Sequence, residues 1–151
     1  MAVMKECVLC SRNPDGLVYA GENWHVILVD ETGYPGFCRV IWNRHVAEMT
    51  DLDEKHRTEL MDVVFLVERC VRQVMRPDKI NLASLGNMVP HLHWHVIPRY
   101  ADDAHFPDSV WSVARRSADE QVIQERKSRL PELRRRLGQV LTVQYGPARG
   151  L

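Results

Sequence analysis

The sequence predicts an α+β domain in which a long helix covers one face of an antiparallel sheet. Two observations support this fold class. Residues 17–42 contain three short runs of β-forming residues separated by turns rich in Gly, Pro and Asn, a pattern typical of an antiparallel meander. A later segment repeats apolar residues at helical spacing over about 24 residues, and two more strand-like runs follow it.

The three runs of the meander are joined by connections too short to contain a crossover helix, so consecutive strands should pair antiparallel. They are Leu17–Ala20, Trp24–Asp30 and Phe37–Trp42. A polar turn at residues 11–16 precedes them, and a second turn at residues 31–36 joins the last two.

The long helix should begin near Thr50 or Asp51, either of which can cap its first turn, where Asp53 and Glu54 complement the helix dipole. Pro77 should end it near Arg76. Its apolar positions recur at helical spacing and are Leu60, Val63, Val64, Val67, Cys70, Val71 and Val74.

A fourth strand, Lys79–Leu85, and a loop at residues 86–90 lead into a fifth strand that carries the histidines of residues 91–95. An acidic loop follows at residues 101–109. The remaining chain is helical and charged, with Pro131 as the expected first residue of a last helix.

The composition indicates one soluble globular domain, since 45% of the 151 residues are hydrophobic and 26% are charged. Lys plus Arg (20) balance Asp plus Glu (20), which argues against nucleic-acid binding but allows a single nucleotide as ligand. No stretch resembles a signal peptide or a membrane span. We therefore expect a cytoplasmic protein whose four cysteines form no disulfide framework.

Residues 91–97 (HLHWHVI) alternate histidine with apolar residues. As a strand, this segment places His91, His93 and His95 on one face, about 7 Å apart, and directs Leu92 and Trp94 toward a core. A histidine can attack phosphorus when its ring is oriented and its attacking nitrogen is unprotonated. The alternative is a surface histidine stripe or a fortuitous metal patch. A P-loop NTPase is excluded because no GxxxxGK[ST] motif is present.

The HLHWHVI segment resembles the signature of the histidine triad (HIT) superfamily at every position, and Pro98-Arg99-Tyr100 is similar to the continuation in its bacterial hydrolase branch. A third histidine, where the transferase and phosphorylase branches have Gln, also points to the hydrolase branches. The resemblance extends over about residues 6–100. It implies a five-stranded antiparallel sheet paired across a homodimer, with residues 1–110 as the HIT-like domain and residues 111–151 as a C-terminal helical extension of it.

The resemblance also implies a reaction. Family members cleave nucleotide conjugates at the α-phosphate through a covalent nucleotidyl-histidine. We expect a purine nucleotide or dinucleotide substrate, either a dinucleoside polyphosphate or a nucleoside phosphoramidate or ester. By motif position His93 is the nucleophile, His95 supports the phosphate and leaving group, and His91 is a supporting or metal-linked member of the row.

Substrate-binding roles follow from the same resemblance. Asp30 matches the family position that contacts ribose hydroxyls, with a plain turn-capping role as the alternative, and Leu28 would line the base pocket. Two positions depart from the adenosine phosphoramidase branch. Met88 stands where that branch has a Ser that aids the leaving group, and Asn87 stands where Gln is common. Asn87 is the remaining substrate-binding candidate, with a simple turn role as the alternative.

A zinc site is a second expectation. Cys7 and Cys10 alone are a weak zinc signal, but some bacterial family members complete a tetrahedral site with a His after the third strand and the first triad His. His45 and His91 occupy those places. Such a zinc would be structural and not required for catalysis. The alternatives are a reduced, metal-free CxxC pair and, less favoured, a thioredoxin-like redox pair.

Other residues receive ordinary roles. Cys38 and Cys70 are expected to be buried. Arg134–Arg136 should form a solvated helix face, with a phosphate patch as the less favoured alternative. Arg99 should make a surface salt bridge, with phosphate sensing as the alternative. Trp111 could reach a dimer partner's site but matches no family position.

Two other functions remain open beside the hydrolase. One is a non-catalytic nucleotide-binding or zinc-stabilised interaction protein. The other is a nucleic-acid end-processing enzyme, which the neutral charge balance disfavours.

Overall fold

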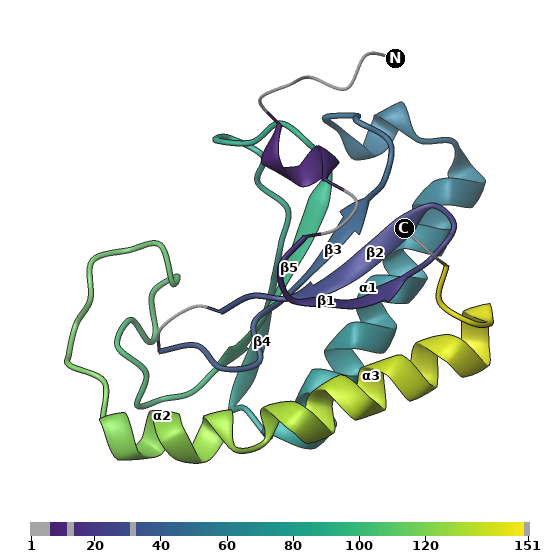
Figure 1. Cartoon of the computed structure of the whole chain (residues 1–151). Helices are drawn as coiled ribbons and strands as arrows, with labels where there is room; N and C mark the ends of the chain where they lie inside the picture. Colours follow the sequence, from purple (N-terminus) through teal and green to yellow (C-terminus); the bar gives the residue numbers. More distant parts are fainter. Residues whose placement is uncertain (1–6, 12–13, 31–32, 150–151) are drawn as a thin grey trace.

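The computed structural model describes residues 7–11, 14–30 and 33–149. It contains one five-stranded sheet in the order β1-β2-β3-β5-β4, and every neighbouring pair is antiparallel (Figure 1). The strands are β1 (Leu17–Ala20), β2 (Trp24–Leu28), β3 (Cys38–Trp42), β4 (Lys79–Ala83) and β5 (His93–Arg99). The α+β class and the antiparallel sheet predicted from the sequence are confirmed.

Three α-helices and two short 3-10 turns complete the fold. They are η1 (Val8–Cys10), η2 (Met49–Asp51), α1 (Glu54–Met75), α2 (Glu120–Lys127) and α3 (Leu130–Tyr145). The helix α1 begins later than the sequence predicted because Asp53, rather than Thr50 or Asp51, accepts the capping hydrogen bond from the His56 backbone N–H. Asp51 instead closes η2 through a reciprocal capping box with Glu48. The last helix, in contrast, begins one residue earlier than predicted, at Leu130 rather than Pro131.

The strands are also shorter than the runs that predicted them. The structure ends β2 at Leu28 and β4 at Ala83, and it begins β3 at Cys38. The turns expected at residues 11–16 and 31–36 can be compared only in part, because residues 12–13 and 31–32 lie outside the described residues.

The main core lies between one face of the sheet and the helices α1 and α3. It takes alternate residues of the strands, including Val26, Val40 and Val96, all fully buried. The helix α3 contributes Leu133, Leu137 and Leu141 to the same core. Full burial of one such side chain is worth about 1.5–3 kcal/mol, so the C-terminal helix and the sheet stabilise each other.

The opposite face of the sheet carries the chemistry-bearing residues. The strand register aligns His25, Ile41 and His93 in one row across the sheet. The next row contains Ile27, Arg39 and His95. A small apolar cluster, formed by Tyr34, Phe37 and Ile97 with Val29 and Val110 packed against it, lies on this face. The chain between β5 and α2 brings Val110 there, so a loop rather than a helix covers this side of the sheet.

Among the residues that the structure describes, no helix is both long and apolar enough to cross a membrane.

Candidate active site and metal centre

The strand that carries the histidines begins at His93, not at His91. Pro90 has no backbone N–H, and the Leu92 backbone is bonded elsewhere: its N–H donates to the Val46 carbonyl at 2.7 Å, and its carbonyl accepts from the Trp42 N–H at 3.1 Å. On the other side of β5, the pairing with β4 extends only as far as Ala83 opposite His95, so His91 precedes the paired part of the strand. The expected row of three histidines on one strand is therefore a pair, His93 and His95, preceded by a third histidine with different neighbours.

His93 is held as a neutral imidazole with one nitrogen available. Its Nδ1 lies 2.5 Å from the main-chain oxygen of His91. A carbonyl oxygen only accepts, so we assign the proton to Nδ1 and the lone pair to Nε2. Burial lowers the pKa of His93, against the opposing effect of the hydrogen bond to the His91 carbonyl. The Ser84 hydroxyl donates to the His93 carbonyl at 2.7 Å, which fixes the backbone as well.

His95 has the complementary proton arrangement. The Arg39 Nε donates to His95 Nδ1 at 3.3 Å, so Nδ1 holds the lone pair and Nε2 carries the proton. Burial, followed by the nearby His93 and Arg39, lowers the pKa of His95 to about 3. The two rings lie edge to face, with centroids 4.8 Å apart. The pair thus combines a nitrogen lone pair on one ring with an N–H donor on the other.

Two aromatic side chains enclose His95. The Phe37 ring centroid lies 5.6 Å from that of His95, and the Trp111 ring centroid lies 5.0 Å from it. Sequence reasoning assigned Trp111 to no site in its own chain. No spacing could have revealed this contact, because it depends on how the loop after β5 folds back over the sheet.

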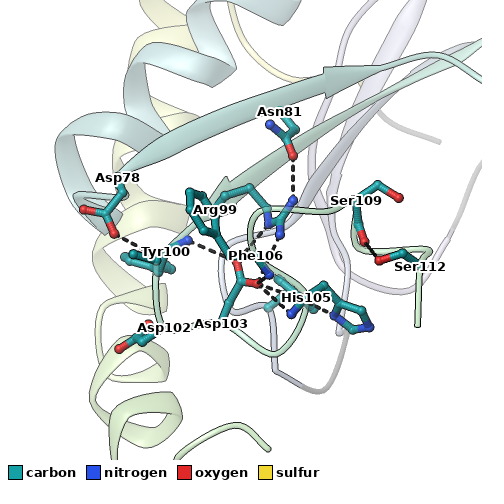
Figure 2. A network of polar contacts seen from close by, with 12 residues as sticks. Asp78, Asn81, Arg99, Tyr100, Asp102, Asp103, His105, Phe106, Ser109 and Ser112 are labelled. Atoms are coloured by element: carbon teal, nitrogen blue, oxygen red, sulfur yellow. Dashed lines mark hydrogen bonds and ion pairs between the residues drawn. The ribbon is translucent and has the colours of Figure 1, made fainter. Parts of the chain in front are cut away.

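Arg99 is buried, which corrects the expected surface salt bridge. Its guanidinium bonds to Asp103 at 2.8 Å and 3.1 Å and to the Asn81 side-chain oxygen at 2.8 Å (Figure 2). Both Arg99 and Asp103 are only 2–3% exposed.

Asp103 organises the start of the loop that follows β5. Its carboxylate accepts hydrogen bonds from the backbone N–H groups of Tyr100, His105 and Phe106 (Figure 2). Burial alone would raise the pKa of Asp103, but the bonds from Arg99 and these amides outweigh it and lower the pKa to about 2. The network fixes the first turn of the loop that carries Trp111.

Asp30 and Leu28, the expected ribose and base contacts, both line a pocket of about 390 Å³ at the end of β2. Asp30 is exposed there. Leu28, however, aligns with Cys38 and Val96 and packs against the main core. Side chains alternate along a strand, so Leu28 points away from the face of His93 and His95.

The loop before β5 exposes two residues considered from the sequence, Asn87 and Met88, to solvent. Asn87 is exposed and its side chain makes no hydrogen bond within the described part of the chain. Met88 is 95% exposed. A second pocket, of about 310 Å³, lies beside His93 and is lined in part by Ser84, Gly86 and Met49.

The four predicted metal ligands come together on the Nδ1 side of the His91 ring. The ligand atoms of Cys7, Cys10, His45 and His91 all lie within 4.8 Å of one another. Cys10 Sγ is 3.3 Å from His45 Nδ1, and the two Nδ1 atoms of His45 and His91 are 3.1 Å apart. A tetrahedral zinc with ordinary bond lengths would separate two nitrogens by about 3.4 Å, and a nitrogen and a sulfur by about 3.6 Å.

The tautomer of His91 also fits a metal ligand. Its Nε2 lies 2.6 Å from the Trp42 carbonyl, so the proton is on Nε2 and the lone pair of Nδ1 points into the Cys/His cluster. Metal-bound histidines usually donate their other N–H to a carbonyl in this way. Two soft sulfurs and two imidazole nitrogens are a donor set that zinc prefers.

The remaining candidates have structural partners. Cys38 and Cys70 are buried, as predicted. Each arginine of the Arg134–Arg136 run has a protein partner: the Leu17 carbonyl for Arg134, Glu132 and Gln139 for Arg135, and Gln73 for Arg136. These contacts agree with a solvated helix face.

The structure defines an α+β protein whose five-stranded antiparallel sheet carries a histidine pair on the face opposite the helices. The HIT domain family model matches residues 11–102. The chain belongs to the HIT (histidine triad) family.

Two curated relatives share about a third of their aligned residues with this chain. One, described as an AP-4-A phosphorylase of Mycobacterium tuberculosis, is 33% identical over 99 residues, which cover 61% of this chain and 51% of the relative. The other, described as an asymmetrical bis(5'-nucleosyl)-tetraphosphatase of Schizosaccharomyces pombe, is 32% identical over 83 residues, or 52% of this chain and 46% of the relative. The chain thus spans about half the length of these relatives.

Solved structures agree with the fold over a longer range. A histidine triad protein of Bradyrhizobium japonicum is 32% identical, with a TM-score of 0.61, and the match covers 78% of this chain and 90% of the other. A histidine triad family protein of Mycobacterium smegmatis, described as Zn-bound, is 24% identical, with a TM-score of 0.62 and coverage of 91% and 97%.

Proposed function

We propose that this protein is a nucleotide hydrolase that cleaves a nucleotide conjugate at its α-phosphate through a covalent nucleotidyl-His93 intermediate. The observation that supports the proposal is the pairing of opposite tautomers on β5. His93 presents a lone pair at Nε2, and His95 presents an N–H at Nε2. The relatives described as an AP-4-A phosphorylase and a tetraphosphatase agree with a reaction on nucleotides.

In the first step the Nε2 lone pair of His93 forms a bond to the α-phosphorus, and the bond from phosphorus to the leaving group breaks. The His93 ring becomes positively charged, and its Nδ1–H remains bonded to the His91 carbonyl, whose dipole favours that charge. His95 donates a hydrogen bond from its Nε2–H to a phosphate oxygen or to the leaving atom. A polyphosphate departs as an anion and takes no proton. An amine departs with the Nε2 proton of His95, and that ring regains a proton from the attacking water in the second step.

In the second step water attacks the same phosphorus, the nitrogen–phosphorus bond breaks, and the electron pair returns to His93 Nε2. A mononucleotide is released, together with one proton when the leaving group was a polyphosphate. The transferred group therefore always includes the α-phosphate, so a dinucleoside polyphosphate and a phosphoramidate give the same mononucleotide product.

The test is the His93→Ala variant. We expect mononucleotide release to fall by about 10⁴-fold or more, because the residue supplies the only bond to phosphorus in the mechanism. AMP binding, measured by calorimetry, should persist. Intact-mass analysis of quenched wild-type protein should show a nucleotidyl adduct that the variant lacks. His56→Ala, a half-buried histidine on α1 far from β5 in sequence, is the matched control, and unchanged turnover in His93→Ala would end the proposal.

A non-catalytic nucleotide-binding or zinc-stabilised interaction protein is the second candidate function. Met88 is exposed and has no hydrogen-bond donor for a leaving group, which favours a binding protein over a phosphoramidase. A panel of diadenosine polyphosphates, adenosine phosphoramidate and adenylyl-lysine separates the two functions. Affinity without mononucleotide release from any of them would support the second.

We propose that Cys7, Cys10, His45 and His91 bind one structural zinc, which ties η1 to the residues before β5. Its role is to cross-link the chain, and no step of the proposed reaction passes through it. Metal analysis should find about one zinc per chain in the wild-type protein and none in Cys10→Ser. Chelation should lower the melting temperature of the wild type but not that of Cys10→Ser, and a metal-free wild-type protein would contradict the assignment.

We also propose a homodimer. The strand β4 is the last in the sheet order, so one edge of its backbone is available for pairing. Apolar side chains are exposed on or near it, namely Leu82, Leu85 and Met88, and Phe65 is exposed on α1. Light scattering should give twice the chain mass, and Leu82→Glu should shift it toward the monomer. A monomeric wild type would contradict this proposal.

A further inference from the structure

Trp111 is a large aromatic side chain beside His95, and the proposed reaction assigns it no role. The indole and the His95 ring meet in an edge-to-face contact, with the centroids 5.0 Å apart at an interplanar angle of 65°. Yet Trp111 is 51% exposed. About half of the indole surface is therefore available for contact with a ligand, and an aromatic ring offers a large apolar area for such a contact.

The loop around Trp111 is held in place by its own contacts. The preceding residue, Val110, packs against the apolar cluster of Tyr34, Phe37 and Ile97. Arg115 forms an ion pair with Asp108 at 2.7 Å across the base of the loop, and the Ser112 hydroxyl donates to the Ser109 carbonyl at 2.6 Å (Figure 2).

A second set of bonds ties the end of the loop to its start. The Arg116 guanidinium donates to the main-chain carbonyls of Asp103 and Phe106 at 2.6 Å and 2.9 Å. The backbone N–H of Arg115 donates to the Ala104 carbonyl at 2.7 Å. The loop backbone that carries the indole is therefore held in place before any ligand arrives, which reduces the entropy lost on binding.

We propose that Trp111 is the stacking platform for the nucleobase of the substrate and gives the site its preference for purine nucleotides. This inference rests on the proposed function, because it takes His93 and His95 as the phosphate end of the site. A ribose is the only spacer between the α-phosphate and the base. The base of a nucleotide bound at His95 thus falls within reach of the neighbouring indole.

Of the two aromatic side chains beside His95, Trp111 is better placed than Phe37 to stack on a base. Phe37 is only 3% exposed and belongs to the apolar cluster, so its faces are already covered. Leu28, the expected base contact, points to the opposite face of the sheet. An exposed indole face binds any base by stacking, and a purine covers more of it than a pyrimidine does.

The rival role for Trp111 is structural, namely to shield His95 from water. The two roles differ in what the ligand must contain. A platform acts only on ligands that carry a base, whereas a shield affects every ligand that bears a phosphate. The measurement is therefore binding of AMP and of ribose 5-phosphate, by calorimetry, to the wild type, Trp111→Ala, Trp111→Phe and the control Val113→Ala, which removes an exposed side chain from the same loop.

We expect Trp111→Ala to weaken AMP binding roughly ten- to hundredfold, which corresponds to the loss of one base-stacking contact. Ribose 5-phosphate should bind within about twofold of wild type, Trp111→Phe should restore part of the AMP affinity, and Val113→Ala should change neither ligand. Wild-type protein should bind AMP more tightly than CMP, and Trp111→Ala should reduce that ratio.

Equal losses for AMP and ribose 5-phosphate would overturn the platform, as would no loss for either or no AMP binding by the wild type. Because the measurement uses product binding, it does not depend on turnover. A protein that loses AMP affinity in Trp111→Ala but releases no mononucleotide from any substrate would keep the platform and lose the hydrolase proposal.

Discussion

Replacing Asp103 by Asn tests whether the buried ion pair with Arg99 supports the loop beside the candidate active site. Oδ2 accepts from Arg99 Nε at 2.8 Å and from the Tyr100 N–H at 3.1 Å. An amide NH₂ at that position cannot accept either bond and would leave the Arg99 charge buried and uncompensated. Breaking a buried pair in this way costs about 3–5 kcal/mol.

The pKa of Asp103 gives an independent check on this magnitude. A fall from 3.8 to about 2 means that the ionised form is favoured in the folded protein by about 2.4 kcal/mol. A depressed carboxyl pKa stabilises the fold above the unfolded value near 3.8 and loses that contribution as the pH falls toward 2. Deletion of the charge by substitution should cost at least this amount at neutral pH.

The assay is urea unfolding at neutral pH. With a slope of about 2 kcal/mol/M, the midpoint of Asp103→Asn should fall by about 1.5–2.5 M. The matched control is Glu132→Gln, which removes an ion pair between two exposed side chains, Arg135 (59%) and Glu132 (50%). Surface pairs are worth about 0–1 kcal/mol. If Asp103→Asn lost no more stability than Glu132→Gln, the assigned role of the buried network would be wrong.

Two further measurements address the histidine face and the helical core. The pKa of His95 is about 3 in the fold and near 6.5 in an unfolded chain, so the unfolded state binds the extra proton. The free energy of unfolding should therefore fall by up to about 1.4 kcal/mol per pH unit from pH ~6.5 down toward pH ~3; His95→Gln should flatten this dependence, and an unchanged profile would contradict the assignment. Leu137→Ala should cost about 2–5 kcal/mol in urea unfolding because the side chain is fully buried. Val143→Ala, 83% exposed, should stay within about 0.5 kcal/mol of wild type, and similar losses in both variants would argue against the shared core.

The sequence predicted most of the fold because its signals are local. Alternation within residues 93–97 reports which side chains share a face of one strand, and that is why His93 and His95 were paired correctly. Leu28 shows the limit. Its own strand was recognised, but the face it occupies relative to His95 depends on the register of β2 with β3 and β5, which spacing within β2 does not contain.

The candidate site was predictable to the same extent. The four proposed zinc ligands come from three separate segments, and only the family resemblance joined Cys7 and Cys10 to His45 and His91. Trp111 and the burial of Arg99 were missed because both depend on how the loop after β5 closes. The decisive residue there is Asp103, one of several acidic residues in that segment, and its five N–H donors become visible only when the loop is folded.

His91 belongs to two centres through different parts of the same residue. Its ring points into the Cys/His cluster, whereas its main-chain oxygen orients the His93 ring. Every amino acid brings that same oxygen. A substitution such as His91→Gln would therefore separate the two centres: it would remove a proposed metal ligand and leave the main-chain acceptor of His93, the proposed nucleophile, in place. The first position of the triad is free to vary in type without disorienting the second, provided that the backbone keeps its path.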